Sequence, residues 1–239
     1  MRLSLLLLCA TMAAPALADW DDYDYQEERE LAVDAGGVAS FTIDAGAGSL
    51  VINGVDGAAS IEVTATILVS GAKDEKAREF IADRMILELE RSGDRASLTA
   101  DFKDSMGWRK GGAIALDIRV PKGINLDIDD GSGSIQVYDT VGSVELNDGS
   151  GSIKVRNVAD VRIDDGSGSI DISDASGDVW IDDGSGSVTI QGVTGSIVVD
   201  DGSGSINVSD VEGDFRVVDA GSGSVNYRDI AGEIDIPED

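Results

Sequence analysis

The sequence predicts an all-β chain folded as a single-stranded β-solenoid, in which coils of about 18 residues stack on one another and each coil contains two short strands. Three observations predict this class. The motif "DDGSGSI", which begins at Asp129, recurs in close copies along the rest of the chain. Apolar residues recur about every nine residues, in pairs two positions apart. The first glycine of the motif recurs at spacings of 18, 17, 18, 18 and 19 residues, at Gly131, Gly149, Gly166, Gly184, Gly202 and Gly221.

The paired apolar residues predict the strands. Ile170 and Ile172, and then Val179 and Ile181, alternate with polar residues, which is the pattern of a strand with one buried face. Stacked coils then place these side chains in buried ladders, where each contributes on the order of 1.5–3 kcal/mol. Recurrence about every nine residues favours two sheets per coil, and a three-sided coil of similar length is the alternative.

Glycine, serine and aspartate predict the turns between strands. Glycine tolerates positive φ and close backbone approach, and aspartate and serine side chains bond nearby backbone groups. One turn of each coil is "DDGSGS", and the other resembles the segment from Asp174 to Asp178. The segment "NVADVRI" from Asn157 is one residue short and lacks the glycine of this second turn, which predicts a distorted corner there.

Residues 19–122 form a region of different character, and regular repeats occupy residues 123–239. The segment "DAGAGSLVINGVDG" from Asp44 matches one coil, with Leu50 and Ile52 in the inward positions. The following insertion predicts one short helix in "KDEKAREFIADR" from Lys73 and a hairpin in "MILELERSGDRASLTADF" from Met85. We expect this β-rich region to cap the open end of the solenoid, because an unpaired strand edge invites aggregation.

The first 18 residues, "MRLSLLLLCATMAAPALA", have the charge, apolar run and small-residue cleavage pattern of a secretory signal peptide. Maturation at Asp19 would remove Cys9, which makes a poor lipidation site. No stretch of the chain approaches the roughly 20 apolar residues of a membrane-spanning helix. We therefore expect an exported protein, located in the periplasm, at the outer-membrane surface or outside the cell. The segment "DWDDYDYQEERE" from Asp19 predicts a flexible acidic arm, with a partner-binding segment as the alternative.

Charge and composition exclude several functions. The chain has 18 basic and 46 acidic residues, no histidine and a formal net charge of -28. This charge argues against nucleic acid as a partner and disfavours anionic membrane surfaces, whereas cations are natural candidate ligands. Without histidine or a mature cysteine, Ser-His-Asp and Cys-His chemistry are excluded too. We therefore expect a protein without enzymatic activity, catalytic residues or cofactors, apart from the candidate calcium site described next.

Stacking predicts two columns of acids along the repeats. Neighbouring acids of a column are expected about 4.8 Å apart, which is the spacing of adjacent strands, so their like charges repel. Either each carboxylate accepts hydrogen bonds within its own turn and stays solvated, or a row of Ca²⁺ ions binds between the coils. The second column comprises Asp129, Asn147, Asp164, Asp182, Asp200 and Val218. The first column, whose members are the candidate Ca²⁺ ligands, comprises Asp130, Asp148, Asp165, Asp183, Asp201 and Asp219.

One outward spot is apolar. Trp180 and Val198 are predicted to lie one coil apart on the same face, in line with Glu145, Arg162 and Arg216. Isolated exposed apolar residues are common, so this spot is a candidate binding face without further support from the sequence.

The lead-in "VPKG" at Val120, the early coil and the "GSGSI" repeats resemble a bacterial β-strand-repeat family labelled "putative adhesin", from about Leu31 to Ile236. The resemblance implies a β-solenoid of the cell envelope with no enzymatic activity and supplies no site residues. The expected function is that of a non-catalytic, structural or adhesin-like binding scaffold with an unidentified envelope or surface partner. End-to-end association of two or more copies of the chain is a further expectation that the sequence leaves open. The alternative is a Ca²⁺-binding envelope protein.

Overall fold

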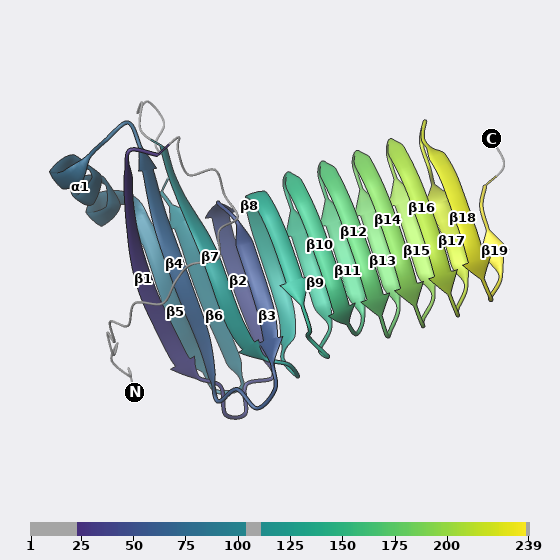
Figure 1. The fold of residues 1–239 in the computed structure, drawn as a ribbon, viewed down its shortest axis with the longest axis horizontal. Helices are drawn as coiled ribbons and strands as arrows, with labels where there is room; N and C mark the ends of the chain where they lie inside the picture. The colour runs from purple at the N-terminus through teal and green to yellow at the C-terminus, as the bar shows by residue number, and fades with distance from the viewer. Residues whose placement is uncertain (1–22, 104–110, 238–239) are drawn as a thin grey trace.

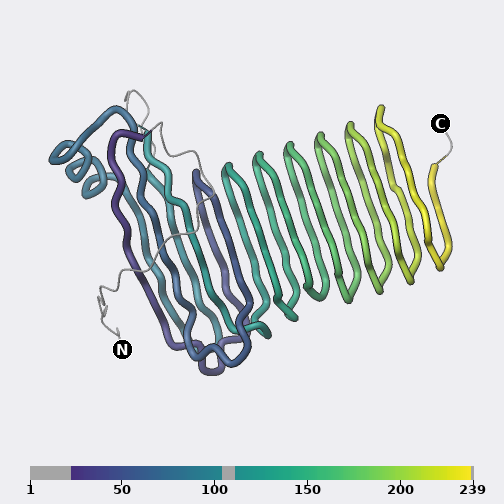
Figure 2. The backbone as a smooth tube through the Cα atoms, in the orientation of Figure 1, coloured from purple at the N-terminus to yellow at the C-terminus, as the bar shows by residue number. Residues whose placement is uncertain are grey.

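A computed structural model describes residues 23–103 and 111–237 (Figure 1). The predicted signal peptide lies outside the described residues. The backbone winds in narrow coils along the long axis of the molecule, from a wider N-terminal region to the C-terminal repeats (Figure 2). Over these described residues the chain is the predicted all-β solenoid with one short helix.

The repeats contain two strands per coil, as predicted. The long strand β8 (Asn125–Tyr138) starts the regular stack and contributes to both sheets. The following strands alternate between five-residue and eight-residue lengths up to the last coil. They are β9 (Val144–Asp148), β10 (Gly151–Val158), β11 (Val161–Asp165), β12 (Gly168–Ala175), β13 (Val179–Asp183), β14 (Gly186–Val193), β15 (Ile197–Asp201), β16 (Gly204–Val211), β17 (Phe215–Asp219), β18 (Ser224–Ile230) and β19 (Ile234–Asp235).

These strands form two parallel sheets that face each other. In sheet A, β8, β10, β12, β14, β16 and β18 pair in sequence, with Ile153 beside Ile135 and Ile170. In sheet B, β8, β9, β11, β13, β15, β17 and β19 pair in the same way. The two-sided coil is therefore confirmed over the three-sided alternative.

The N-terminal region extends both sheets beyond the repeats. The early coil consists of β2 (Ser40–Ala47) and β3 (Leu50–Val55), which pair in parallel with the two halves of β8. Leu50 and Ile52 are buried, as predicted. Beyond this coil, β6 (Arg95–Phe102) pairs with β2 and β7 (Gly111–Pro121) pairs with β3, so the early coil is covered on its other side. The remaining strands are β1 (Tyr25–Asp34), β4 (Ser60–Ser70) and β5 (Met85–Ser92).

The predicted helix and hairpin are both present in this region. Helix α1 (Asp74–Arg84) buries Ala77, Phe80 and Ile81, and the rings of Phe80 and Phe102 stack with their centroids 5.3 Å apart. Strands β5 and β6 pair antiparallel. They continue sheet B, while β1 and β4 continue sheet A beyond β7. The end of the stack thus closes with antiparallel strands and a helix.

The acidic segment is a strand from Tyr25 onward, which corrects the predicted flexible arm for that part. Residues 25–34 form β1 and pair along their whole length with β4. Leu31 and Val33 pack against the core, while the acids of the segment occupy other positions of the strand. The hydroxyl of Tyr25 donates to Glu27 at 3.0 Å, and the guanidinium of Arg78 lies 5.9 Å from the Tyr25 ring centroid. Residues 19–22 lie outside the described residues.

Glycine is required at the first corner because the coils stack there through their backbones. A Cβ at Gly166 would lie 2.6 Å from the carbonyl oxygen of Gly149 in the preceding coil. At Gly168 a Cβ would lie 1.6 Å from the oxygen of Gly151, and the φ of Gly168 is +149°, which side-chain-bearing residues rarely adopt. The "GSG" run therefore permits the close approach of successive coils.

The second corner is built around a left-handed residue, which is Asp174 in one coil and Gly192 in the next. At the short coil the left-handed residue is Asn157, with φ +56°. Two residues, instead of three, then separate β10 from β11, and the pairing of Val158 with Ala175 keeps the register. The predicted irregularity is thus a shortened corner that leaves the neighbouring ladders in place.

Candidate functional site: an internal aspartate file and two outer faces

Five of the candidate aspartates point into the solenoid. In β9, Val144 and Leu146 are buried, and the same alternation carries Asp148 inward at the end of the strand. Register partners continue the column in neighbouring coils. We call these residues the aspartate file; their relative exposures are 0–6%, and they are Asp130, Asp148, Asp165, Asp183 and Asp201.

Four of the five carboxyls of the file are fixed by serine backbone amides in their own turns. The N–H groups of Ser150, Ser167, Ser185 and Ser203 donate to the Oδ1 atoms of Asp148, Asp165, Asp183 and Asp201 at 2.9–3.1 Å. This confirms the predicted local hydrogen bonds. The expectation that these carboxylates stay solvated is wrong, because strand alternation turns them toward the core.

Asp219 does not belong to the file, which corrects the predicted column. The register shifts between Val199 and Asp200, so that Asp219 pairs with Asp200 and Val218 is an extra residue. Asp219 is exposed, and its Oδ1 atom accepts the N–H of Gly221 at 2.8 Å. The sequence carried a signal for this position: Asp219 precedes the motif glycine by two residues, as Asp200 does, and Ala220 stands directly before it.

Burial raises the pKa of every carboxyl in the file. The pKa of Asp130 rises to about 7, first because of desolvation and then because of Asp148 and Asp129. The pKa values of Asp165 and Asp183 rise to about 6, again through desolvation and neighbouring aspartates, against the lowering effect of the serine N–H groups. Asp148 and Asp201 shift in the same direction for the same first reason. Each carboxyl of the file therefore keeps its proton to a higher pH than an exposed aspartate does.

The second predicted column faces outward along sheet B. Asp164, Asp182 and Asp200 are register neighbours, and Asn147 continues the column. The pKa of Asp182 is raised by partial desolvation and by Asp164 and Asp200, whereas Arg162 lowers it. Val218, which the sequence placed in this column, is the extra residue of the register shift.

Acids at the second corner connect successive coils. The Oδ1 atom of Asp160 accepts the N–H of Asp178 at 2.9 Å, and that of Asp178 accepts the N–H of Ser196 at 2.8 Å. Asp214 accepts the N–H of Glu233 at 2.8 Å in the same manner. These exposed acids satisfy backbone donors between coils, in addition to giving the protein its charge.

The outer face of sheet B has the apolar spot that the sequence predicts. Glu145, Arg162, Trp180, Val198 and Arg216 are successive register partners. The guanidinium of Arg162 lies 3.5 Å from the Trp180 ring centroid, a cation-π contact. Trp180 and Val198 are half-buried, so the spot is partly covered by its neighbours.

The outer face of sheet A differs sharply from that of sheet B, and we did not predict this from the sequence. Its outward positions from β12 to β16 form straight columns, because the strands pair in register. Asp171 is the charged residue within these columns, and Lys154 of the preceding coil pairs with it at 3.3 Å. The exposed acids Asp174 and Asp210 lie beside the columns at the second corner, where Asp210 accepts a hydrogen bond from the Gln191 amide at 3.0 Å. The polar character of this face could have been read from the residues that alternate with the apolar ones after each "GSGS" run. The outward set is Ser169, Asp171, Ser173, Ser187, Thr189, Gln191, Ser205, Asn207 and Ser209.

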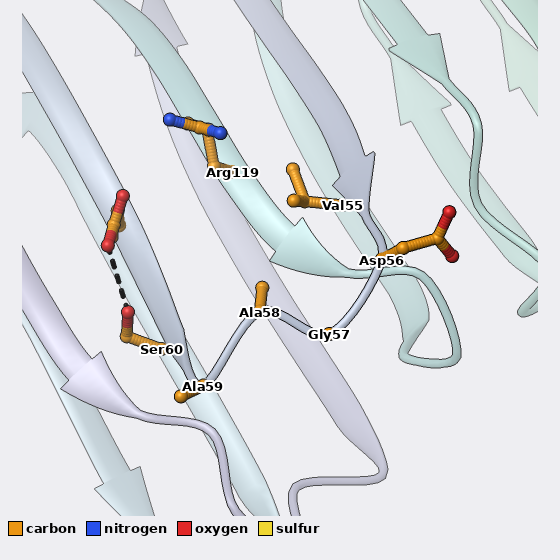
Figure 3. A pocket seen from close by; sticks show the side chains of 8 residues that line it. Val55, Asp56, Gly57, Ala58, Ala59, Ser60 and Arg119 are labelled. Carbon is orange, nitrogen blue, oxygen red and sulfur yellow. Dashed lines mark hydrogen bonds between the residues drawn. The ribbon is translucent and has the colours of Figure 1, made fainter.

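A shallow pocket of about 290 Å³ lies at the connection between β3 and β4, between Val55–Ser60, Glu62 and Arg119 (Figure 3). Three of its polar residues have partners: the Ser60 hydroxyl donates to Glu62 at 3.0 Å, and Lys122 pairs with Asp56 at 3.0 Å. Within residues 23–103 and 111–237, no group of three or more Asp, Glu, Cys or His side chains has the arrangement of a metal site. The predicted Ca²⁺ role of the aspartates stays a prediction. The helix of the described structure is too short and polar to cross a bilayer.

No protein-family model matches the chain, and neither does any curated protein. Among solved structures, it is similar to a "putative cell adhesion protein" from Clostridium sporogenes, at 10% identity over 89% of this chain and 100% of the other, with a TM-score of 0.37. It is also similar to "putative adhesins" from Bacteroides fragilis (14% identity, 90% and 99% coverage, TM-score 0.33) and Parabacteroides distasonis (15% identity, 89% and 97% coverage, TM-score 0.35). These likenesses are too low to support a functional argument.

Proposed function

We propose that this protein is an exported, non-catalytic binding scaffold of the bacterial cell envelope, adhesin-like in its task. The observation that carries the proposal is the outer face of sheet A. In a chain with a formal net charge of -28, this face presents hydroxyl and amide side chains in straight columns. Groups of this kind bind an extended, hydrogen-bonding polymer without the long-range repulsion that a row of carboxylates imposes.

Composition supports the absence of catalysis in this proposal. The chain contains no histidine, and its single cysteine, Cys9, lies in the predicted signal peptide. The acids that the structure places at the two corners accept backbone N–H groups of their own or a neighbouring coil. Their repetition from coil to coil is the pattern of a structural element, whereas acid-base catalysis uses a pair of carboxyls in different environments.

Binding to envelope components tests the proposal directly. Purified chain from Asp19 onward would be co-sedimented with bacterial outer-membrane vesicles and with peptidoglycan sacculi. We expect retention on one of these, and loss of that retention when Thr189→Arg and Asn207→Arg place two bulky charges on sheet A. The matched control is Trp180→Ala with Val198→Ala on sheet B, which should leave retention unchanged. Absence of wild-type retention on both materials, or equal loss with both double variants, would contradict the proposal.

A further inference from the structure

The aspartate file is a row of five buried carboxyls that has a defined boundary at each end. Its members are register partners in five adjacent strands, so their backbones repeat at the strand spacing of about 4.8 Å. Ala45 is the register partner of Asp130 in the early coil. At the other end, Ala220 follows Asp219, the partner of Asp200, and packs against the core. The file thus begins and ends beside alanine, which brings no polar atom that needs a partner.

Each carboxyl of the file has an unsatisfied oxygen. The Oδ2 atoms of all five aspartates are buried and have no hydrogen-bond partner in the part of the chain that the structure describes. A buried carboxylate without compensating donors is strongly destabilising, whereas a neutral carboxylic acid has a donor of its own. One proton per carboxyl would turn each Oδ2 from an unsatisfied acceptor into a hydroxyl that can donate to the carboxyl of the next coil.

Within residues 23–103 and 111–237, no basic group is among the causes that shift the pKa values of the file. The charged groups that act on it are its own members and the outward aspartates of the same strands, namely Asp129, Asp164, Asp182 and Asp200, and all of them raise its pKa values. Arg162 acts on the outward Asp182. The inward residues of sheet A, such as Ile153, Ile170 and Val188, are apolar.

We propose that the folded protein holds protons along the aspartate file, with the Oδ2 hydroxyl of one coil donating to a carboxyl oxygen of the next. The protons come from solvent when the chain folds and return to it when the chain unfolds or when the file ionises. A proton needs two oxygens, which is what adjacent coils offer through their free Oδ2 and carboxyl acceptors. Ca²⁺ takes six to eight oxygen ligands, and the Oδ1 atoms of Asp148, Asp165, Asp183 and Asp201 already accept serine N–H groups.

The sign of the pH dependence follows from the direction of these shifts. An unfolded aspartate titrates near 3.9, and the file titrates higher in the folded protein. The stabilisation from the file is therefore complete below about pH 4 and is lost as the pH rises through the folded values of about 6 to 7. Over that interval the folded state binds more protons than the unfolded state, so the free energy of unfolding falls with pH.

The test compares Asp165→Asn, inside the file, with Asp164→Asn, its outward neighbour, which removes the same charge from the surface. Denaturant unfolding of the chain from Asp19 onward, between pH 5 and 8.5, gives the difference in bound protons from the slope of stability against pH. We expect Asp165→Asn to reduce this slope by about one proton near pH 5 and Asp164→Asn to leave it nearly unchanged. Infrared spectra at pH 5.5 should show a protonated-carboxyl band in the wild type that weakens in Asp165→Asn.

Asparagine matches aspartate in shape, and Asp183→Asn repeats the test at a second position if Asp165→Asn does not fold. Absence of a protonated-carboxyl band in the wild type at pH 5.5 would overturn the proposal without any variant. Equal changes of slope in the inward and outward variants would overturn it as well. A final measurement compares unfolding at pH 8 in chelator, in Ca²⁺ and in Mg²⁺ at matched ionic strength. If Ca²⁺ selectively stabilises the protein and Asp165→Asn abolishes this stabilisation, the file is a metal site and the proposal is overturned.

Discussion

Replacing glycines at the first corner by alanine should separate the two reasons for their presence. At Gly168 an added Cβ meets the oxygen of Gly151 at 1.6 Å, and φ is +149°. At Gly166 the Cβ meets the oxygen of Gly149 at 2.6 Å without a positive φ. Gly123, in the turn before β8, is a matched control, since a Cβ there has no heavy atom within 4 Å.

The magnitudes follow from these contacts. Forcing a side-chain-bearing residue into a sparsely populated backbone region costs about 1–3 kcal/mol, and overpacking costs a further 1–3 kcal/mol or so. We therefore expect Gly168→Ala to lower the free energy of unfolding by about 2–6 kcal/mol and Gly166→Ala by about 1–3 kcal/mol. Gly123→Ala should change it by less than about 1 kcal/mol. A small domain has about 5–15 kcal/mol in total, so Gly168→Ala approaches global unfolding.

Urea unfolding followed by far-ultraviolet circular dichroism measures the series, with the midpoint and the slope fitted for each variant. The order Gly168, Gly166, Gly123 is the result that the stacked backbone requires. If Gly168→Ala unfolds within about 0.5 kcal/mol of Gly123→Ala, the coils can separate at this corner at little cost, and the steric account of the "GSG" run is refuted.

Three further predictions concern other parts of the coils. Ile172→Ala removes a fully buried side chain from sheet A and should lower the free energy of unfolding by about 2–5 kcal/mol in the same urea assay; a loss below about 1 kcal/mol would mean that the ladder collapses around the gap. Asp178→Ala removes the acceptor for the N–H of Ser196 and should cost about 1 kcal/mol, whereas Asp171→Ala, on the outer face, should cost less than about 0.5 kcal/mol; equal losses would argue against the connecting role of the corner. Trp180→Ala removes a surface cation-π contact and should lower the thermal midpoint by only a few degrees, as for a loss of about 1 kcal/mol; a large drop would show that the ring is part of the core.

The sequence was sufficient for the coils because spacing and alternation are both local signals. The motif glycines located each coil, and paired residues such as Ile170 and Ile172 located the inward faces, which the structure confirms as buried. The helix from Asp74 to Arg84 was predictable from the spacing of its three buried residues.

The inward aspartates were harder to predict, although the alternation itself included them. Counting by twos from Val161 through Ile163 reaches Asp165, but charged residues are rarely fully buried, so composition argued for the surface. The extra residue at Val218 then displaced Asp219 from the expected column. Strand β1 was not predicted because its acidic residues interrupt the apolar–polar alternation that indicates a strand. Its partner, β4, is also distant in the sequence, so no local signal pairs the two strands.

The alanines beside the aspartate file show how this rod could change in length. The inner coils carry an aspartate before the motif glycine, whereas Ala45 and Ala220 hold that position in the flanking coils. Duplication of one inner coil would lengthen the rod by one strand spacing, about 4.8 Å, and would extend the file by one carboxyl. The flanking coils would remain the same, so a gene could gain or lose whole coils in steps without redesign of either boundary. A carboxyl introduced at Ala45 or Ala220 would, by contrast, move the boundary itself.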